Sequence, residues 1–234
     1  VIDNGLGLSE ARDMAEVAGK YIDFVKLGFG TCRLIDENLI RKKIAIYREH
    51  EISVYPGGTL LEAAVYQGVI DEFLDEAKKL GFDAIEVSDG TITMSYEQRR
   101  DIINKALKRG FRVISEVGKK DRARDLRGEA YAEGIKLDLE LGVFKVIVEA
   151  RASGKGIGIY DESGGIRADK LETILREVDV KDIIFEAPNK NQQVYLLLRF
   201  GCNTNLGNIR PQDVIPVEAL RQGLRGDTMK TVYG

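Results

Sequence analysis

The stretch KKLGFDAIEV (78–87) joins a basic helix end to a glycine and then to an apolar run that contains Glu86. The same arrangement recurs in KRGFRVISEV (108–117) and in LELGVFKVIVEA (139–150). Glycine tolerates the left-handed conformation in which many helices end, and the apolar run that follows is typical of a strand buried on both faces of a parallel sheet. A helix-to-strand joint that repeats in this way indicates consecutive βα units.

Working outward from these joints, eight alternations of strand and helix can be placed along the chain. Strands are expected at 1–5, 22–27, 52–55, 84–87, 112–117, 145–149, 182–185 and 202–206. Helices are expected near 9–19, 36–49, 59–79, 95–109, 124–141, 168–177, 190–200 and 216–223. The pattern predicts an α/β fold with parallel strands, a (β/α)₈ TIM barrel, in a single domain over residues 1–234; such barrels usually have about 250 residues.

A doubly wound open sheet is the main alternative fold. It usually has fewer strands, and no G-x-G-x-x-G motif opens a helix after the first strand. The first strand is short and the chain starts at Val1 rather than at methionine. We therefore expect an N-terminus that is truncated.

Composition narrows the classes of function. The net charge is −3 with 31% charged residues, so there is no electrostatic reason to expect nucleic-acid or membrane binding. The two cysteines, Cys32 and Cys202, are far apart and match no metal or disulfide pattern, which favours a cytoplasmic protein. With His50 as the single histidine, acid–base chemistry is expected from lysine, carboxylate or tyrosine side chains.

Four strand-like segments carry a glutamate at or near their ends: Glu86, Glu116, Glu149 and Glu186. In a (β/α)₈ barrel the carboxyl ends of the strands form the mouth that carries the active site. Unpaired carboxylates in one mouth repel, and they need a cation, a basic side chain or a proton. A hard divalent ion such as Mg²⁺ meets that need, whereas a buried ion-pair ring with Lys26 or Arg151 is the structural alternative.

Further polar groups follow other predicted strands. Lys26 lies in the apolar second strand and is either a functional cation or an ion-pair partner. Gly57 and Gly58 precede a predicted helix, where backbone amides can bind an anion.

Basic residues follow the sixth and eighth strands. Arg151, Ser153 and Lys155 lie in a glycine-rich segment that is suited to a mobile anion-binding loop. Arg225 follows the eighth strand, near which barrels often bind phosphate, whereas Arg221 is expected to be ion-paired on the last helix. The residues alone therefore predict an anionic, phosphorylated small substrate, a carboxylate-held Mg²⁺ and lysine acid–base chemistry.

Eight motifs, in order along nearly the whole chain, resemble the phosphosulfolactate synthase family. They are YIDFVKLGFGT (21–31), VYPGGTL (54–60), IEVSDGT (85–91), SEVGKK (115–120), VIVEARASGKGIG (146–158), IIFEAPNK (183–190), NLGNI (205–209) and LRQGLRGDT (220–228). The resemblance implies a (β/α)₈ barrel that requires Mg²⁺ and adds sulfite to phosphoenolpyruvate, which yields (2R)-2-phospho-3-sulfolactate. Such a product feeds coenzyme M synthesis or sulfolactate production.

This resemblance assigns expected roles to named residues. Glu116, Glu149 and Glu186 are the candidate metal ligands, with Glu86 as an ion-pair or supporting residue. The family pattern makes Lys120 the acid that protonates C2, and its parity with Glu116 along the strand favours it over Lys119. Lys26 is expected to orient the substrate carboxylate. Phosphate or sulfite is expected to be bound by Arg151, Ser153, Lys155 and Arg225.

Two other functions remain open from the sequence. A Schiff-base aldolase on the same barrel would use Lys26 or Lys155 against a phosphorylated keto substrate. A catalytically silent barrel would act as a binding protein, since a fold does not guarantee an activity. We expect a homo-oligomer, because barrel enzymes often self-associate.

Overall fold

The computed structural model describes all residues from 1 to 234 and contains eight short strands. They are β1 (Ile2–Asp3), β2 (Phe24–Leu27), β3 (Ser53–Pro56), β4 (Ala84–Val87), β5 (Arg112–Val117), β6 (Lys145–Val148), β7 (Ile183–Glu186) and β8 (Leu206–Gly207). Every pairing between neighbours is parallel, with β1 to β3 hydrogen-bonded as one sheet and β4 to β8 as a second.

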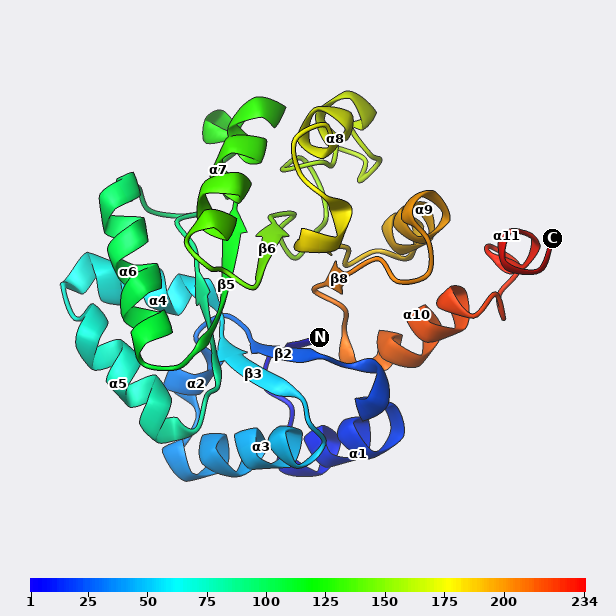
Figure 1. Cartoon of the computed structure of the whole chain (residues 1–234). Helices are drawn as coiled ribbons and strands as arrows, with labels where there is room; N and C mark the ends of the chain where they lie inside the picture. Colours follow the sequence, from blue (N-terminus) through cyan, green and yellow to red (C-terminus); the bar gives the residue numbers. More distant parts are fainter.

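The two sheets meet at two seams, where isolated hydrogen bonds replace a strand ladder. At one seam the Val54 amide donates to the Asp83 carboxylate at 2.8 Å. At the other the Ile2 amide donates to the Ile209 carbonyl at 2.9 Å. The strands therefore form a barrel, and helices surround them (Figure 1).

Eleven α-helices follow or connect the strands. They are α1 (Leu8–Ala18), α2 (Thr31–Leu34), α3 (Glu37–Glu49), α4 (Gly58–Gln67), α5 (Ile70–Leu80), α6 (Tyr96–Lys108), α7 (Gly128–Glu140), α8 (Ala168–Leu175), α9 (Lys190–Phe200), α10 (Val214–Arg221) and α11 (Met229–Tyr233). A core of 45 buried residues lies largely between the helices and the sheets. None of these helices has the length and apolar character that a membrane crossing requires.

The predicted barrel of parallel strands is confirmed, with three local corrections. The helix expected at 59–79 is two helices, because Gly68 adopts a left-handed conformation (φ 72°) that ends α4. The last strand lies at Leu206–Gly207 rather than at 202–206. The expected helices also omit α2 and α11, which have four and five residues and too few turns for a helical period.

Candidate active site

An apolar layer inside the barrel lies directly beneath a charged layer. The apolar layer consists of Phe24, Ala84, Ile114, Ile147 and Ile184, together with Tyr55. Side chains alternate along a strand, so the residues two positions later, toward the carboxyl ends, point to the same side. Those residues are Lys26, Glu86, Glu116, Glu149 and Glu186. The alternation of the strands thus brings one lysine and four glutamates together at one mouth.

The ammonium group of Lys26 lies among three of these carboxylates. Its Nζ atom is 2.9 Å from Glu86, 3.6 Å from Glu116 and 3.5 Å from Glu186. Burial opposes the charge on Lys26, but the three carboxylates outweigh this effect and hold its pKa well above the ordinary value. Lys26 is therefore a fixed positive charge.

A second lysine, Lys120, faces the other side of the same cluster. Its Nζ atom lies 4.0 Å from one carboxylate oxygen each of Glu62, Glu116 and Glu149. Burial works against its charge, yet Glu116 and Glu149 raise the pKa of Lys120 above the ordinary value. Parity along β5 predicts that Glu116 and Lys120 face the same side, and the structure places them together.

The carboxylates outnumber the two lysines, and the imbalance is concentrated at Glu116 and Glu149. Oε1 of Glu116 and Oε2 of Glu149 are buried and accept no hydrogen bond. Burial, followed by the Glu116 carboxylate, raises the pKa of Glu149 well above 4.5. Burial also acts on Glu116, but Lys26 and Lys120 hold the pKa of Glu116 below its ordinary value. The pair therefore needs either a proton or a cation between its members.

Glu116, Glu149 and Glu186 fit the donor set of a hard divalent cation. One oxygen from each of these buried side chains lies within 4.8 Å of the others. Two of the three carboxylates are also held in place by backbone amides, because Glu149 accepts from the Arg151 amide and Glu186 from the Ala150 amide at 3.0 Å. Oxygen ligands in a fixed arrangement with unpartnered lone pairs are suited to Mg²⁺.

The cluster predicts how stability depends on pH in the metal-free protein. Burial raises the pKa of Glu86 from 4.5 to about 7 despite the attraction of Lys26. The folded state keeps this proton while the unfolded chain loses it, so stability should fall as the pH rises from about 5 to about 7. At about 1.4 kcal/mol for each pH unit, the loss from Glu86 is about 3 kcal/mol. Urea denaturation in EDTA at several pH values measures it; Glu86→Gln should reduce the slope, and an unchanged slope would contradict the assignment.

The predicted anion-binding residues after β6 lie on an exposed loop. The side chains of Arg151, Ser153 and Lys155 are exposed, and none of them forms an ion pair in the structure. Arg151 has a left-handed backbone (φ 59°). The loop is held near the start of α9, because the side-chain amide of Asn189 donates to the Ser153 carbonyl at 2.9 Å. The two cationic side chains of this loop, Arg151 and Lys155, are therefore open to solvent and have no ion-pair partner in the protein.

The anion-binding residues predicted after β3 (Gly57 and Gly58) and after β8 (Arg225) contact other groups of the protein. The Gly57 amide donates to the Leu27 carbonyl at 2.9 Å, and the Gly58 amide donates to Glu86 at 2.8 Å. The expected anion cradle of free amides is therefore absent at these two glycines. Arg225 lies 3.9 Å from Asp227, whose carboxylate binds Lys190 more closely, at 2.8 Å.

Sequence reasoning missed two residues of α4 that reach the mouth. Thr59 accepts a hydrogen bond from Lys120 Nζ at 2.9 Å. Glu62 is buried and accepts from Ser88 Oγ at 2.7 Å and from the Thr91 amide at 2.8 Å. Positions i and i+3 share one face of a helix, so the T-x-x-E spacing at the start of this helix was an available signal.

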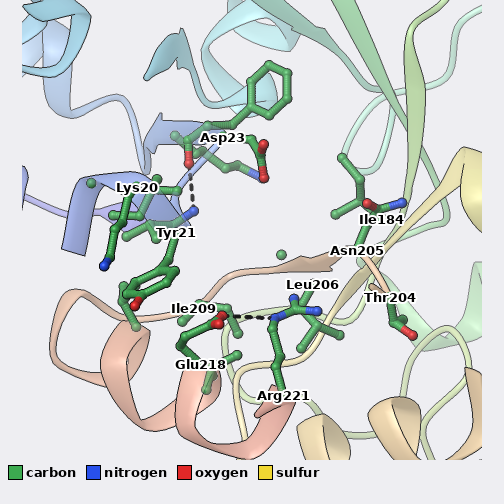
Figure 2. A pocket seen from close by; sticks show the side chains of 18 of the residues that line it. Lys20, Tyr21, Asp23, Ile184, Thr204, Asn205, Leu206, Ile209, Glu218 and Arg221 are labelled. Atoms are coloured by element: carbon green, nitrogen blue, oxygen red, sulfur yellow. Dashed lines mark hydrogen bonds and ion pairs between the residues drawn. The ribbon is translucent and has the colours of Figure 1, made fainter. Parts of the chain in front are cut away.

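A cavity of about 660 Å³ lies on the other side of the interior, toward the amino ends of the strands (Figure 2). Its lining includes Asp23, Ile184, Leu206 and Arg221 and reaches Lys26. None of the three candidate metal ligands lines it. The unpaired carboxylates therefore place the candidate site at the opposite mouth, at the carboxyl ends of the strands.

Comparisons with known proteins identify the family of the chain. The profile of the (2R)-phospho-3-sulfolactate synthase (ComA) family matches residues 1–227. A phosphosulfolactate synthase from Methanocaldococcus jannaschii is 46% identical, covering 99% of this chain and 93% of that protein. One from Bacillus subtilis is 41% identical, covering 97% and 90%.

Solved structures of lower identity share the fold. The 3-hexulose-6-phosphate synthase of Salmonella typhimurium superposes with a TM-score of 0.59 at 16% identity, covering 93% of this chain and 96% of that chain. At that identity the likeness establishes a barrel of the same kind and nothing about substrates. The family match over residues 1–227 and the two close relatives are more specific. The chain belongs to the (2R)-phospho-3-sulfolactate synthase family.

Proposed function

We propose that this protein adds sulfite to phosphoenolpyruvate in a Mg²⁺-dependent reaction that yields (2R)-2-phospho-3-sulfolactate. Family membership supports the class of reaction. The observation that carries the chemistry is the position of Lys120, whose ammonium group lies 4.0 Å from the unpartnered oxygens of both Glu116 and Glu149. A proton donor and carboxylate oxygens without hydrogen-bond partners thus share one mouth.

In this proposal Glu116, Glu149 and Glu186 hold the ion. Their oxygens converge, and backbone amides fix the carboxylates of Glu149 and Glu186. Bound Mg²⁺ supplies a positive charge that stabilises negative charge developing on the substrate carboxylate. Lys26 keeps its charge between Glu86, Glu116 and Glu186, so it limits the repulsion within the cluster and orients an anionic substrate.

Lys120 completes the addition. The sulfur lone pair of sulfite forms a bond to the methylene carbon, C3, and the electrons of the C2–C3 double bond move toward C2 and the carboxylate. The Lys120 ammonium group then gives one proton to C2, and solvent restores it. The exposed Arg151, Ser153 and Lys155 and the partly exposed Arg225 are proposed to bind the phosphate and sulfite oxygens, where arginine can make bidentate contacts.

A Schiff-base aldolase is less well supported by the same contacts. Imine formation requires a neutral lysine, whereas three carboxylates hold the pKa of Lys26 well above its ordinary value. Lys155, the other candidate, is exposed on the loop after β6. It does not lie in the desolvated hydrophobic pocket that activates a Schiff-base lysine.

The proposal predicts sulfite-dependent consumption of phosphoenolpyruvate, which can be followed by phosphorus NMR. Borohydride added during turnover should leave the activity intact and the lysines unmodified, because no imine forms. Consumption that proceeds without sulfite would overturn the proposal. So would a reduced adduct on Lys26 or Lys155, which would favour the aldolase.

A further inference from the structure

A single hydrogen bond directs the ammonium group of Lys120. Its Nζ atom donates to Oγ1 of Thr59 at 2.9 Å. Glu62, Glu116 and Glu149 attract the charge from 4.0 Å, which is longer than a hydrogen bond. Three carboxylates at equal distances confine the ammonium group to one region but do not fix the direction in which it points. The hydrogen bond to the Thr59 hydroxyl fixes that direction.

The stem of Lys120 is also held, by Gly90. The Lys120 amide donates to the Gly90 carbonyl at 3.0 Å. A Cβ atom at position 90 would lie 3.2 Å from Cε, 3.3 Å from Cγ and 3.4 Å from Cδ of Lys120. The lysine therefore lies along the bare backbone of this glycine, and only the end of the side chain remains to be directed.

Thr59 stands on a fixed support. It is in the first turn of α4, next to Gly58, whose amide donates to Glu86 at 2.8 Å. One turn later Glu62 accepts from Ser88 and from the Thr91 amide. These bonds attach the start of α4 to the end of β4 and to the loop that follows β4. The Thr59 hydroxyl is thus a rigid partner for a long and flexible side chain.

We infer that Thr59 is a positioning residue that directs the Lys120 proton to one face of the substrate's C2 carbon and so sets the configuration of the product. This inference rests on the proposed function and deepens it. Lysine has four rotatable side-chain bonds, so without the hydroxyl its ammonium group can turn among the three carboxylates. Misplacement of a reacting group by about 1 Å can cost about 10²-fold in rate, and slow delivery from Lys120 leaves C2 open to protonation by solvent on the other face.

The test compares Thr59→Val, which removes the hydroxyl, with Thr59→Ser, which keeps it. Thr93→Val is the matched control, because Thr93 is an exposed threonine in the neighbouring loop, where it accepts from Arg124. Thr59→Val should lower kcat by about 10- to 100-fold with little change in KM, and the (2S) product should appear beside the (2R) product. Thr59→Ser and Thr93→Val should give the (2R) product alone at close to the wild-type rate.

The configuration of the product decides the inference, because partial unfolding lowers the rate without changing the enantiomer. A Thr59→Val enzyme that makes only the (2R) product, at any rate, would overturn the inference. If the wild-type enzyme makes no product, the proposed function has failed instead. Crystal structures of the wild type and Thr59→Val then test the contact alone: the inference expects a displaced Lys120 Nζ, and an unmoved one overturns it.

Discussion

Replacing Lys120 with alanine is expected to lower kcat by about 10²- to 10⁴-fold, the usual contribution of a positioned general acid. The KM for phosphoenolpyruvate should change little, because the residues proposed to bind phosphate are elsewhere in the mouth. Lys120→Arg should be nearly as inactive. Arginine preserves the positive charge near Glu116 and Glu149 but does not release its proton. Steady-state kinetics with varied sulfite and phosphoenolpyruvate measures both variants.

Lys119, the neighbouring lysine, supplies the control. Its ammonium group donates to the carbonyl and the carboxylate of Asp89, so it fastens the loop and does not face the carboxylate cluster. Lys119→Ala should therefore lose much less activity than Lys120→Ala. Near-wild-type turnover by Lys120→Ala, or by Lys120→Arg, would show that another group protonates C2.

The second large effect is expected at the proposed metal site. Glu116→Gln and Glu149→Gln each replace a carboxylate by a neutral amide of the same shape, so each should lower kcat by about 10²- to 10³-fold, as the loss of one preorganised electrostatic group does. Mg²⁺ should stabilise the wild type by about 2.7 kcal/mol at a concentration of 100 times Kd. Both variants should lose most of that stabilisation, which thermal unfolding with and without Mg²⁺ measures.

Without metal, the same substitution of Glu149 is expected to have the opposite effect on stability. Glu149 is buried beside Glu116, and burial together with that neighbour raises its pKa. Glu149→Gln should therefore be at least as stable as the wild type in EDTA, because the amide needs neither a proton nor a cation to lie beside Glu116. Glu177→Gln is a control on the surface, where Glu177 pairs with Lys136 at 3.0 Å. A Glu149→Gln protein that retains the full response to Mg²⁺ would contradict the metal assignment.

The sequence predicted those parts of the fold that depend on the local spacing of apolar residues and glycines. A glycine at the end of a helix and an apolar run placed β4, β5 and β6 within about one residue of their observed bounds. The same runs carried Glu86, Glu116 and Glu149, so their positions at the strand ends predicted that these side chains lie at one mouth. The helix expected at 59–79 was wrong because one glycine, Gly68, takes a left-handed conformation.

Other parts of the site depend on tertiary contacts that have no local pattern. The Gly57 and Gly58 amides look free in the sequence, but the strand register brings the Leu27 carbonyl and the Glu86 carboxylate to them. Thr59 and Glu62 reach the mouth from a helix rather than from a strand end. Prediction from strand ends alone therefore identifies the charged cluster and misses the hydroxyl that contacts Lys120.

We propose that this ring of carboxylates and lysines adds sulfite to phosphoenolpyruvate with the help of Mg²⁺. The most direct measurement is to incubate the purified protein with both compounds, with Mg²⁺ or with EDTA, and to identify the product by mass spectrometry. We predict phosphosulfolactate in the presence of Mg²⁺ and a loss of the product in EDTA that added Mg²⁺ reverses. Absence of the product with Mg²⁺, or an equal rate of formation in EDTA, would contradict the account.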